Sequence, residues 1–278
     1  MRNAPKTIIT VTVYSLLVLI ALTGCEHKQP DEKSNLSKFI WGNHLTGKTV
    51  ENLAIRSTLT GVIYPYHVYL PASYNTSEKT YPVIYALDGQ WNFKGFTDLI
   101  DKDQRDIILI SIEEGPKASG RRSIDYRLPG VKTYIEFFRQ EFIPLIESKY
   151  RIDSNHRSFQ GTSFGGIAAT AFMFLDDAES PLFENYIAYD ASMWDSPELL
   201  SGLIDARLAK NHPLKVKMFL TTALPLGNHI SVKGFMKDLE ERNIEGLNID
   251  HRSYWVPHDG IAWESFENTL ISIFGVAK

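Results

Sequence analysis

The pentapeptide Gly161-Thr162-Ser163-Phe164-Gly165 is the part of the sequence whose residue types most directly suggest chemistry. It matches the pattern G-x-S-x-G, in which a serine stands at a sharp turn between a strand and a helix. The glycines permit the turn, and the serine is held in a strained, exposed position. The residues before Gly161 have the pattern of a strand and those after Phe164 the pattern of a helix. We therefore expect Ser163 to be a nucleophile rather than an inert serine in a glycine-rich turn.

A serine hydroxyl is a weak nucleophile until a base takes its proton, so a histidine is expected after the last strand. His258, in Val256-Pro257-His258-Asp259-Gly260, follows the last predicted strand and precedes the last predicted helix. Most other histidines precede Ser163 or lie within or before a strand. His229 either faces a substrate or is an idle surface group. His258 is the expected base.

The elements that must position these residues are short apolar runs that alternate with helical patterns from about Phe39 onward. This alternation is typical of βαβ units around a mostly parallel sheet, and no internal repeat or second linker interrupts it. In such a sheet the reactive loops lie at the carboxyl ends of the strands. The predicted strands are Val62–Leu70, Tyr81–Leu87, Asp106–Ile112, a strand into Gly161, Tyr186–Ala188, Lys215–Thr221 and Leu247–Val256. The predicted helices are Val131–Tyr150, one from about Phe164, Pro197–Leu208, Ser231–Arg242 and Ile261–Phe274.

The N-terminus has the pattern of an export signal. Arg2 and Lys6 precede an uncharged run, Ile8 to Leu22, that is short for a bilayer span, which needs roughly 20 apolar residues. The run ends in Leu22-Thr23-Gly24-Cys25, which resembles the lipobox of bacterial lipoproteins and contains the only cysteine of the chain. We predict a signal peptide (1–24), a lipidated Cys25, a polar tether (25–37) and one domain (38–278), anchored in the bacterial envelope and facing the periplasm. An uncleaved anchor helix is the alternative.

Charge and composition exclude some classes of partner. The formal net charge is −4, and loss of residues 1–24 leaves 27 Lys and Arg against 33 Asp and Glu. No basic stripe is present, which argues against a nucleic-acid partner. No His, Cys or Asp cluster has metal-ligand spacing, so no metal or cofactor is expected.

Three motifs in order resemble one family. The run Tyr81-Pro82-Val83-Ile84-Tyr85-Ala86-Leu87-Asp88-Gly89-Gln90, the turn at Ser163 and the run His258-Asp259-Gly260-Ile261-Ala262-Trp263 are similar to the putative-esterase family of α/β-hydrolases. That family includes esterase D, feruloyl esterases, mycolyltransferases and enterochelin-type siderophore esterases. The resemblance spans about residues 60 to 275. It implies a doubly wound, mostly parallel sheet with helices on both faces, a serine carboxylic ester hydrolase, and a small-molecule ester as substrate.

The resemblance also implies an oxyanion hole and a third catalytic residue. The oxyanion hole would be the backbone N–H groups of Gln90 and Phe164. In the family an Asp or Glu that orients the histidine follows the strand predicted here at Lys215–Thr221, but residues 222–230 contain no carboxylate. Three outcomes stay open: Asn228 holds the imidazole, Asp190 or Asp195 reaches it, or Ser163 and His258 work as a dyad. For Asp190 a turn or cap role is preferred.

Substrate contacts are expected from one arginine and from aromatic residues. Arg122 lies in a segment that resembles an arginine-containing loop of the siderophore esterases, where a guanidinium would bind an anionic substrate. Alternatively, Arg122 pairs with Asp125 and only shapes the loop. Trp91, Phe93 and Trp194 are expected in loops at the mouth of the pocket, where they could stack on an aromatic acyl group.

Three functions fit these patterns. The leading one is a serine carboxylesterase of the periplasm that acts on a siderophore lactone. The missing acid favours a second, a ligand-binding lipoprotein on a decayed hydrolase scaffold. The third is a deacylase for polysaccharide or feruloyl esters.

Overall fold

The computed structural model describes residues 45–277 of the chain. The predicted signal peptide, Cys25 and the tether lie outside the described residues. Within residues 45–277, none of the helices combines the length and the apolar character that a bilayer span requires.

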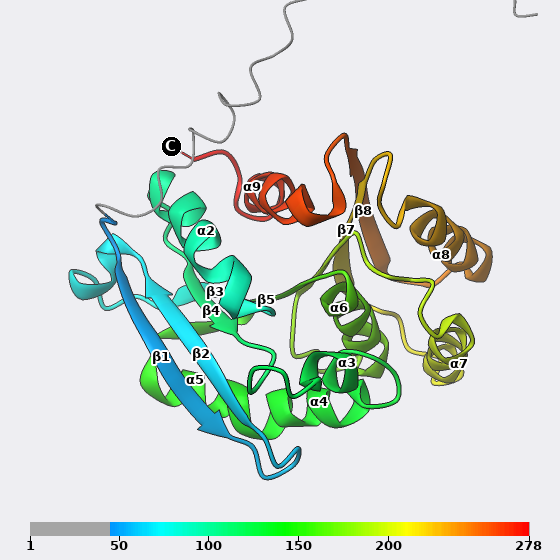
Figure 1. The fold of residues 1–278 in the computed structure, drawn as a ribbon, viewed down its shortest axis with the longest axis horizontal. Coiled ribbons are helices and arrows are strands. Elements are labelled where there is room, and N and C mark those ends of the chain that lie inside the picture. Colours follow the sequence, from blue (N-terminus) through cyan, green and yellow to red (C-terminus); the bar gives the residue numbers. More distant parts are fainter. Residues whose placement is uncertain (1–44, 278) are drawn as a thin grey trace, which may run out of the picture. The chain divides into compact units, whose positions relative to one another are not determined.

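A single sheet of eight strands carries the site. Its strand order is β1-β2-β4-β3-β5-β6-β7-β8 (Figure 1). β1 is antiparallel to β2 and β2 to β4, and the strands from β4 to β8 are mutually parallel. The strands are β1 (Lys48–Arg56), β2 (Ile63–Leu70), β3 (Tyr81–Ala86), β4 (Ile108–Ile112), β5 (Ile152–Thr162), β6 (Asn185–Tyr189), β7 (Val216–Ala223) and β8 (Leu247–Tyr254). Parallel strands present their carboxyl ends at one edge, and that edge is where the sequence places its reactive loops.

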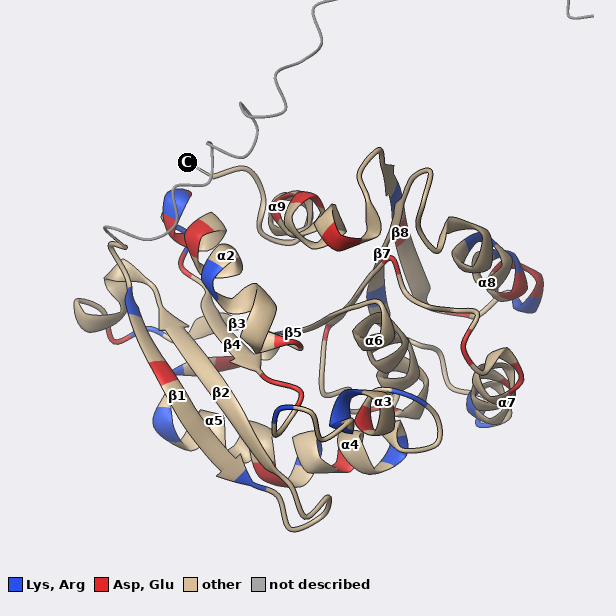
Figure 2. Cartoon of the chain, viewed as in Figure 1, with Lys and Arg blue, Asp and Glu red and all other residues tan. Residues whose placement is uncertain are grey.

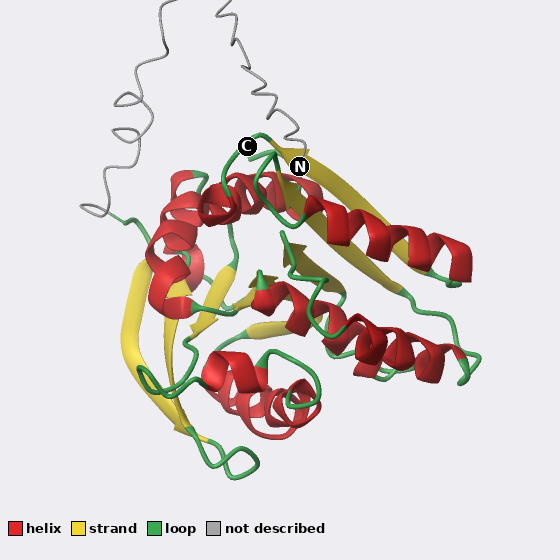
Figure 3. Ribbon diagram, turned by 45° about the vertical axis from the view of Figure 1, so that its right-hand side comes forward, coloured by secondary structure: helices red, strands yellow, loops and turns green. Residues whose placement is uncertain are grey.

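Helices cover both faces of the sheet (Figure 3). On one face α2 (Gly89–Lys102) packs against α9 (Ile261–Phe274), with the rings of Phe96 and Phe266 stacked 3.8 Å apart. The other face is covered by α4 (Val131–Phe137), the π-helical turn η2 (Phe138–Phe142), α5 (Ile143–Lys149), α6 (Phe164–Leu175), α7 (Pro197–Leu208) and α8 (His229–Arg242). Short helical turns complete the set: η1 (Ala72–Asn75), α3 (Arg121–Asp125) and η3 (His258–Gly260).

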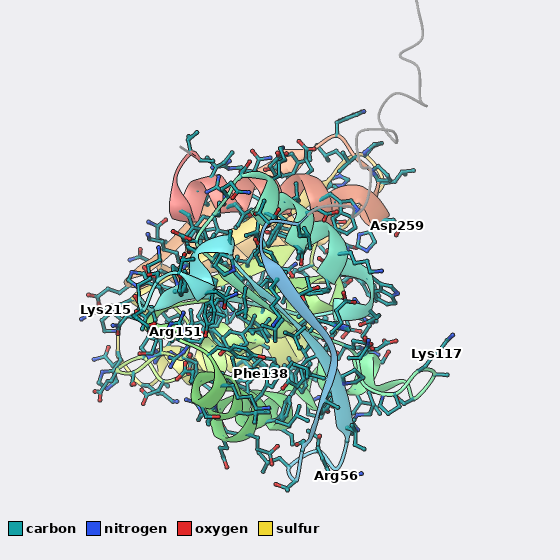
Figure 4. The ribbon with its side chains drawn as sticks, turned by 90° about the vertical axis from the view of Figure 1, so that its left-hand side faces the viewer. Arg56, Lys117, Phe138, Arg151, Lys215 and Asp259 are labelled. Atoms are coloured by element: carbon teal, nitrogen blue, oxygen red, sulfur yellow. The ribbon has the colours of Figure 1, made fainter. Side chains whose placement is uncertain are left out.

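Aromatic side chains fill the core beneath the second face. Phe138 lies in the interior (Figure 4) and makes edge contacts with Phe142, Phe159 and Phe172 at ring-centroid distances of 5.1 to 5.5 Å. Such edge-to-face pairs stabilise a core beyond the area they bury. Phe138 also begins the π-helical turn, so the one helix predicted over Val131–Tyr150 is interrupted there. The exterior is mixed in charge, and acidic and basic residues are interspersed along α8 (Figure 2).

The α/β-hydrolase architecture predicted from the sequence is confirmed, but two of the longer elements, β1 and α2, were missed. β1 is an edge strand whose residues are largely exposed, so it lacks a strong apolar pattern. α2 begins directly at Gly89 and contains Asn92, Gly95 and Thr97 on its buried side, which weakens the apolar helical signal. The omission of α2 matters, because this helix begins at the predicted oxyanion turn.

Candidate active site

Ser163 occupies the sharp turn between β5 and α6. Its backbone has φ 59° and ψ −115°, a conformation that is unfavourable for a residue with a side chain and that marks stored strain. The Ser163 N–H donates to the carbonyl of Tyr189 (2.9 Å), and the Ser163 carbonyl accepts from Gly166 (3.0 Å) and Ile167 (3.2 Å). These bonds hold the turn in the strand-turn-helix context that the motif predicted.

The glycines around the serine differ in how much space they have. A side chain at Gly161 would overlap the backbone of Gly165, and one at Gly166 would lie 2.6 Å from Cβ of Ala191. At Gly165 the nearest atom would be 3.5 Å away, which is ordinary contact. The close packing of α6 on the sheet therefore depends on Gly161 and Gly166, and less on the second glycine of the G-x-S-x-G pattern.

His258 begins the turn η3, after β8, and its ring is held by a carboxylate. Nδ1 of His258 donates to Oδ2 of Asp190 at 2.5 Å. This hydrogen bond raises the pKa of His258 above its ordinary value and outweighs the opposing effect of burial. With Nδ1 occupied as a donor, Nε2 of the neutral imidazole is left as the proton acceptor.

Asp190 is the carboxylate that sequence reasoning undervalued. It directly follows β6, has φ 40° and is fully buried. Besides His258, its carboxylate accepts from the backbone N–H of Ala223 (3.0 Å) and of Asn228 (3.0 Å). The preferred interpretation of Asp190 as only a turn or cap residue was wrong.

The other two candidates for orienting His258 have different partners. Asn228 donates its side-chain amide to the carbonyl oxygen of Asp190 (2.7 Å), so it holds Asp190 and not the imidazole. Asp195 forms an ion pair with Arg127. Asn228 follows β7 and Asp195 follows β6, which is why both were considered for orienting His258. In the structure neither contacts the imidazole.

Ser192, which the sequence analysis did not single out, contacts Ser163. Its hydroxyl is buried and lies 3.1 Å from Oγ of Ser163, and the Asn228 amide is 3.4 Å from the same hydroxyl. Ser163 is thus paired with Ser192 in this structure, and not with His258. Hydrogen bonds between catalytic groups are often formed only when substrate binds, and a rotation about χ1 of Ser163 redirects its hydroxyl.

The predicted oxyanion residues both lie in the first turn of a helix. Gln90 is the second residue of α2 and Phe164 the first of α6. N–H groups in a first helical turn have no intrahelical acceptor, and the helix dipole adds positive potential there. The positions suit stabilisation of a developing oxyanion.

Arg122 binds residues that lie just before both helices, and its guanidinium is not free to bind another anion. Its guanidinium donates two parallel hydrogen bonds, both 2.9 Å, to the buried carboxylate of Asp88, and a third, 3.2 Å, to the carbonyl of Thr162. Burial raises the pKa of Asp88, and the guanidinium opposes that rise. The expected pair with Asp125 is made by Arg121. Arg122 therefore braces the oxyanion turn against the nucleophile turn, and both earlier interpretations of it need correction.

Two exposed tryptophans contact neighbours of the turn at Ser163: Trp91 contacts Arg122, and Trp194 contacts Phe164. Trp91 is 59% exposed and lies over the Arg122 guanidinium at 5.4 Å, and Trp194 is 57% exposed. Trp91 lies on α2, not in a loop. Phe93, also on α2, is buried and stacks on His67, so it is not at the pocket mouth.

No metal site accompanies this arrangement in the part of the chain that the structure describes: residues 45–277 bring together no group of three His, Cys, Asp or Glu side chains suited to a metal ion.

Comparison with known proteins gives one family and a set of related folds. Residues 57–177 match the family model described as putative esterase. An IroE-like serine hydrolase from Shewanella oneidensis superposes with a TM-score of 0.67 at 23% identity, covering 80% of this chain and 78% of that one. A ferulic acid esterase gives 0.61 at 23% identity (83% and 98% covered), and the siderophore hydrolase EstA from Aspergillus nidulans 0.66 at 15% identity (84% and 95% covered). No curated protein matches the sequence.

Proposed function

We propose, from the match of residues 57–177 to the putative-esterase family model, that this chain is a carboxylic ester hydrolase and that Ser163, His258 and Asp190 form its catalytic triad. The observation that carries the proposal is the 2.5 Å hydrogen bond from Nδ1 of His258 to Asp190, at the edge of the sheet where Ser163 is held in a strained turn. The assignment of Asp190 removes the reason for considering a decayed, non-catalytic scaffold, because that idea rested on a missing acid.

The geometry supports a double-displacement mechanism. Ser163 turns from Ser192 to Nε2 of His258, which takes the hydroxyl proton as Oγ attacks the ester carbonyl carbon. The negative charge that develops on the carbonyl oxygen is stabilised by the N–H groups of Gln90 and Phe164. His258 then protonates the departing alcohol and leaves an acyl group on Ser163.

Water completes the cycle. His258 removes a proton from water, which attacks the acyl-enzyme, and the proton returns to Oγ of Ser163 as the carboxylic acid departs. Asp190 keeps its negative charge throughout, because its role is to orient the ring and stabilise the imidazolium.

The substrate is proposed to be recognised mainly by stacking. Arg122 and Arg127 already bind carboxylates, which argues against ion pairing with a substrate anion. Trp91 and Trp194 present exposed rings next to Arg122 and Phe164. A siderophore lactone with aromatic groups is the first substrate to test, and a feruloylated sugar the second. The structural relatives named above include a siderophore hydrolase and a ferulic acid esterase.

The cellular location is a separate proposal. The Leu22-Thr23-Gly24-Cys25 sequence supports a lipid-anchored protein of the bacterial envelope that faces the periplasm. Radiolabelled palmitate incorporation that is lost in Cys25→Ser would support it, and unchanged incorporation would contradict it.

An ester panel tests the activity. Protein lacking residues 1–25 should hydrolyse p-nitrophenyl acetate or butyrate. Its turnover of a trilactone siderophore is then compared with its turnover of feruloylated or acetylated sugars. Ser163→Ala should abolish the turnover of every substrate. Turnover that survives in Ser163→Ala would refute the assignment of the nucleophile.

A further inference from the structure

A groove of about 670 Å³ lies between α7 and α8, outside the catalytic residues described above. The two helices follow β6 and β7 and lie near each other at the same side of the sheet (Figure 1). Four apolar side chains of the lining, Met193, Leu200, Ile204 and Phe235, are buried members of the core, whereas Trp194 and Pro197 line the groove from exposed positions. A groove with a packed lining is preformed, and its volume falls within the ~300–1,000 Å³ of small-molecule sites.

Arg242 binds three residues that line the groove. Its guanidinium donates to Asp238 (2.8 Å) and to Ser201 (2.6 Å), and it also pairs with Asp205. Two carboxylates that line the groove are therefore already neutralised. Glu198, the third carboxylate of the lining, is exposed and repels an anion, so the groove favours an uncharged occupant over an anionic one.

The near end of the groove meets the catalytic site at Trp194. The Trp194 indole N–H donates to Oδ1 of Asn228 (2.9 Å), and its ring is 6.0 Å from that of Phe164, the predicted oxyanion residue. Ser192, two residues earlier, contacts Oγ of Ser163. A substrate that reacts at Ser163 can thus extend past Trp194 into the groove.

Two glycines keep the groove open. Gly202 on α7 and Gly234 on α8 both line it, and a side-chain carbon added at either would meet no atom within 4 Å. Glycine inside a helix is unfavourable relative to alanine, and neither position has the positive φ that would require it. A ligand that occupies the groove would explain why both helices have glycine, and not a larger residue, at these positions.

We propose that this groove is the subsite for an aliphatic chain of the ester substrate. The proposal rests on the ester hydrolase function and adds, beside stacking on the two tryptophans, a contact to an aliphatic part of the same ester. From Ser231 to Asp238 the groove follows eight residues of α8, which are separated by seven helical rises or roughly 10 Å. That length accommodates a medium-length chain, in the acyl or the alcohol half of the ester.

Two substrate series measured on the purified protein test the proposal. p-Nitrophenyl esters from acetate to octanoate vary the acyl half, and acetate esters of ethanol, butanol and octanol vary the alcohol half. In one series kcat/KM should rise with chain length by up to roughly fourfold per methylene buried in the groove. Gly234→Leu fills the groove and should lower the ratio of kcat/KM for the longest over the shortest ester about tenfold.

Control variants separate this effect from general ones. Gly234→Ala strengthens the helix without filling the groove, and Lys237→Leu adds the same side chain on α8 outside the groove, so both should leave the ratio unchanged. A ratio that Gly234→Leu leaves unchanged in both series would overturn the proposal while leaving the esterase intact. Loss of the hydrolase function itself would show differently, as no Ser163-dependent turnover of p-nitrophenyl acetate by the unmodified protein.

Discussion

Oδ2 of Asp190 accepts a 2.5 Å hydrogen bond from Nδ1 of His258, although the two residues are 68 positions apart and follow different strands. The loop after β7, where the family resemblance implied the acid, instead contains Asn228, whose backbone and side-chain N–H groups bind Asp190. In this chain the carboxylate follows β6, the strand that pairs with β7, and Asn228 supports it there.

Asp190→Asn is expected to lower kcat by about 10³–10⁴, because an amide cannot stabilise the imidazolium or select the same tautomer. Asp195→Asn is the matched control and should retain activity within a few-fold, since Asp195 pairs with Arg127 and not with His258. Steady-state kinetics on p-nitrophenyl butyrate measure both. Equal losses in the two variants would argue against Asp190 as the acid.

The pH profile should report the same contact. The bond to Asp190 raises the pKa of His258, and only the neutral imidazole accepts a proton, so kcat/KM should rise with pH through an apparent pKa above 6.5. Asp190→Asn removes the charge that favours the protonated ring, so the inflection should move to lower pH. An inflection that stays in place would mean that another group controls the profile.

The sequence predicted the turn at Ser163 and the position of His258 because both signals are local: a pentapeptide between a strand and a helix, and a histidine after the last strand. The acid was not predictable in this way. Its identity depends on how the loop after β6 meets the loop after β8, which is decided by packing across the sheet. For the same reason the partner of Arg122 was not predicted. Asp88 lies 34 residues upstream, and the sequence suggested Asp125 because it is near Arg122 in the chain.

Arg122→Gln should lower the free energy of unfolding by about 3–5 kcal/mol, because it leaves the Asp88 carboxylate buried and unpaired. Arg252→Gln breaks the exposed pair with Asp250 and should cost no more than about 1 kcal/mol. Urea unfolding measures both costs. If Arg122 also positions the turns at Gln90 and Ser163, Arg122→Gln should lower kcat by a larger factor than it raises KM. Equal losses of unfolding free energy in Arg122→Gln and Arg252→Gln would contradict a structural role for the Arg122–Asp88 pair.

The glycines of the nucleophile turn should differ in tolerance. Gly161→Ala forces a methyl group into the backbone of Gly165 and should destabilise the fold by at least about 1–3 kcal/mol and reduce activity sharply. Gly165→Ala meets only ordinary contacts and should fold and retain most activity. Thermal unfolding and turnover of the two variants provide the comparison, and the reverse order would show that the turn is described wrongly.

Covalent labelling by a fluorophosphonate tests most directly the claim that Ser163 is a nucleophile activated by His258. Intact-protein mass spectrometry should show one adduct per chain, mapped to Ser163 by peptide analysis, with the rate of labelling reduced at least about 100-fold in His258→Ala. No adduct, an adduct at another serine, or an unchanged rate in His258→Ala would contradict the account.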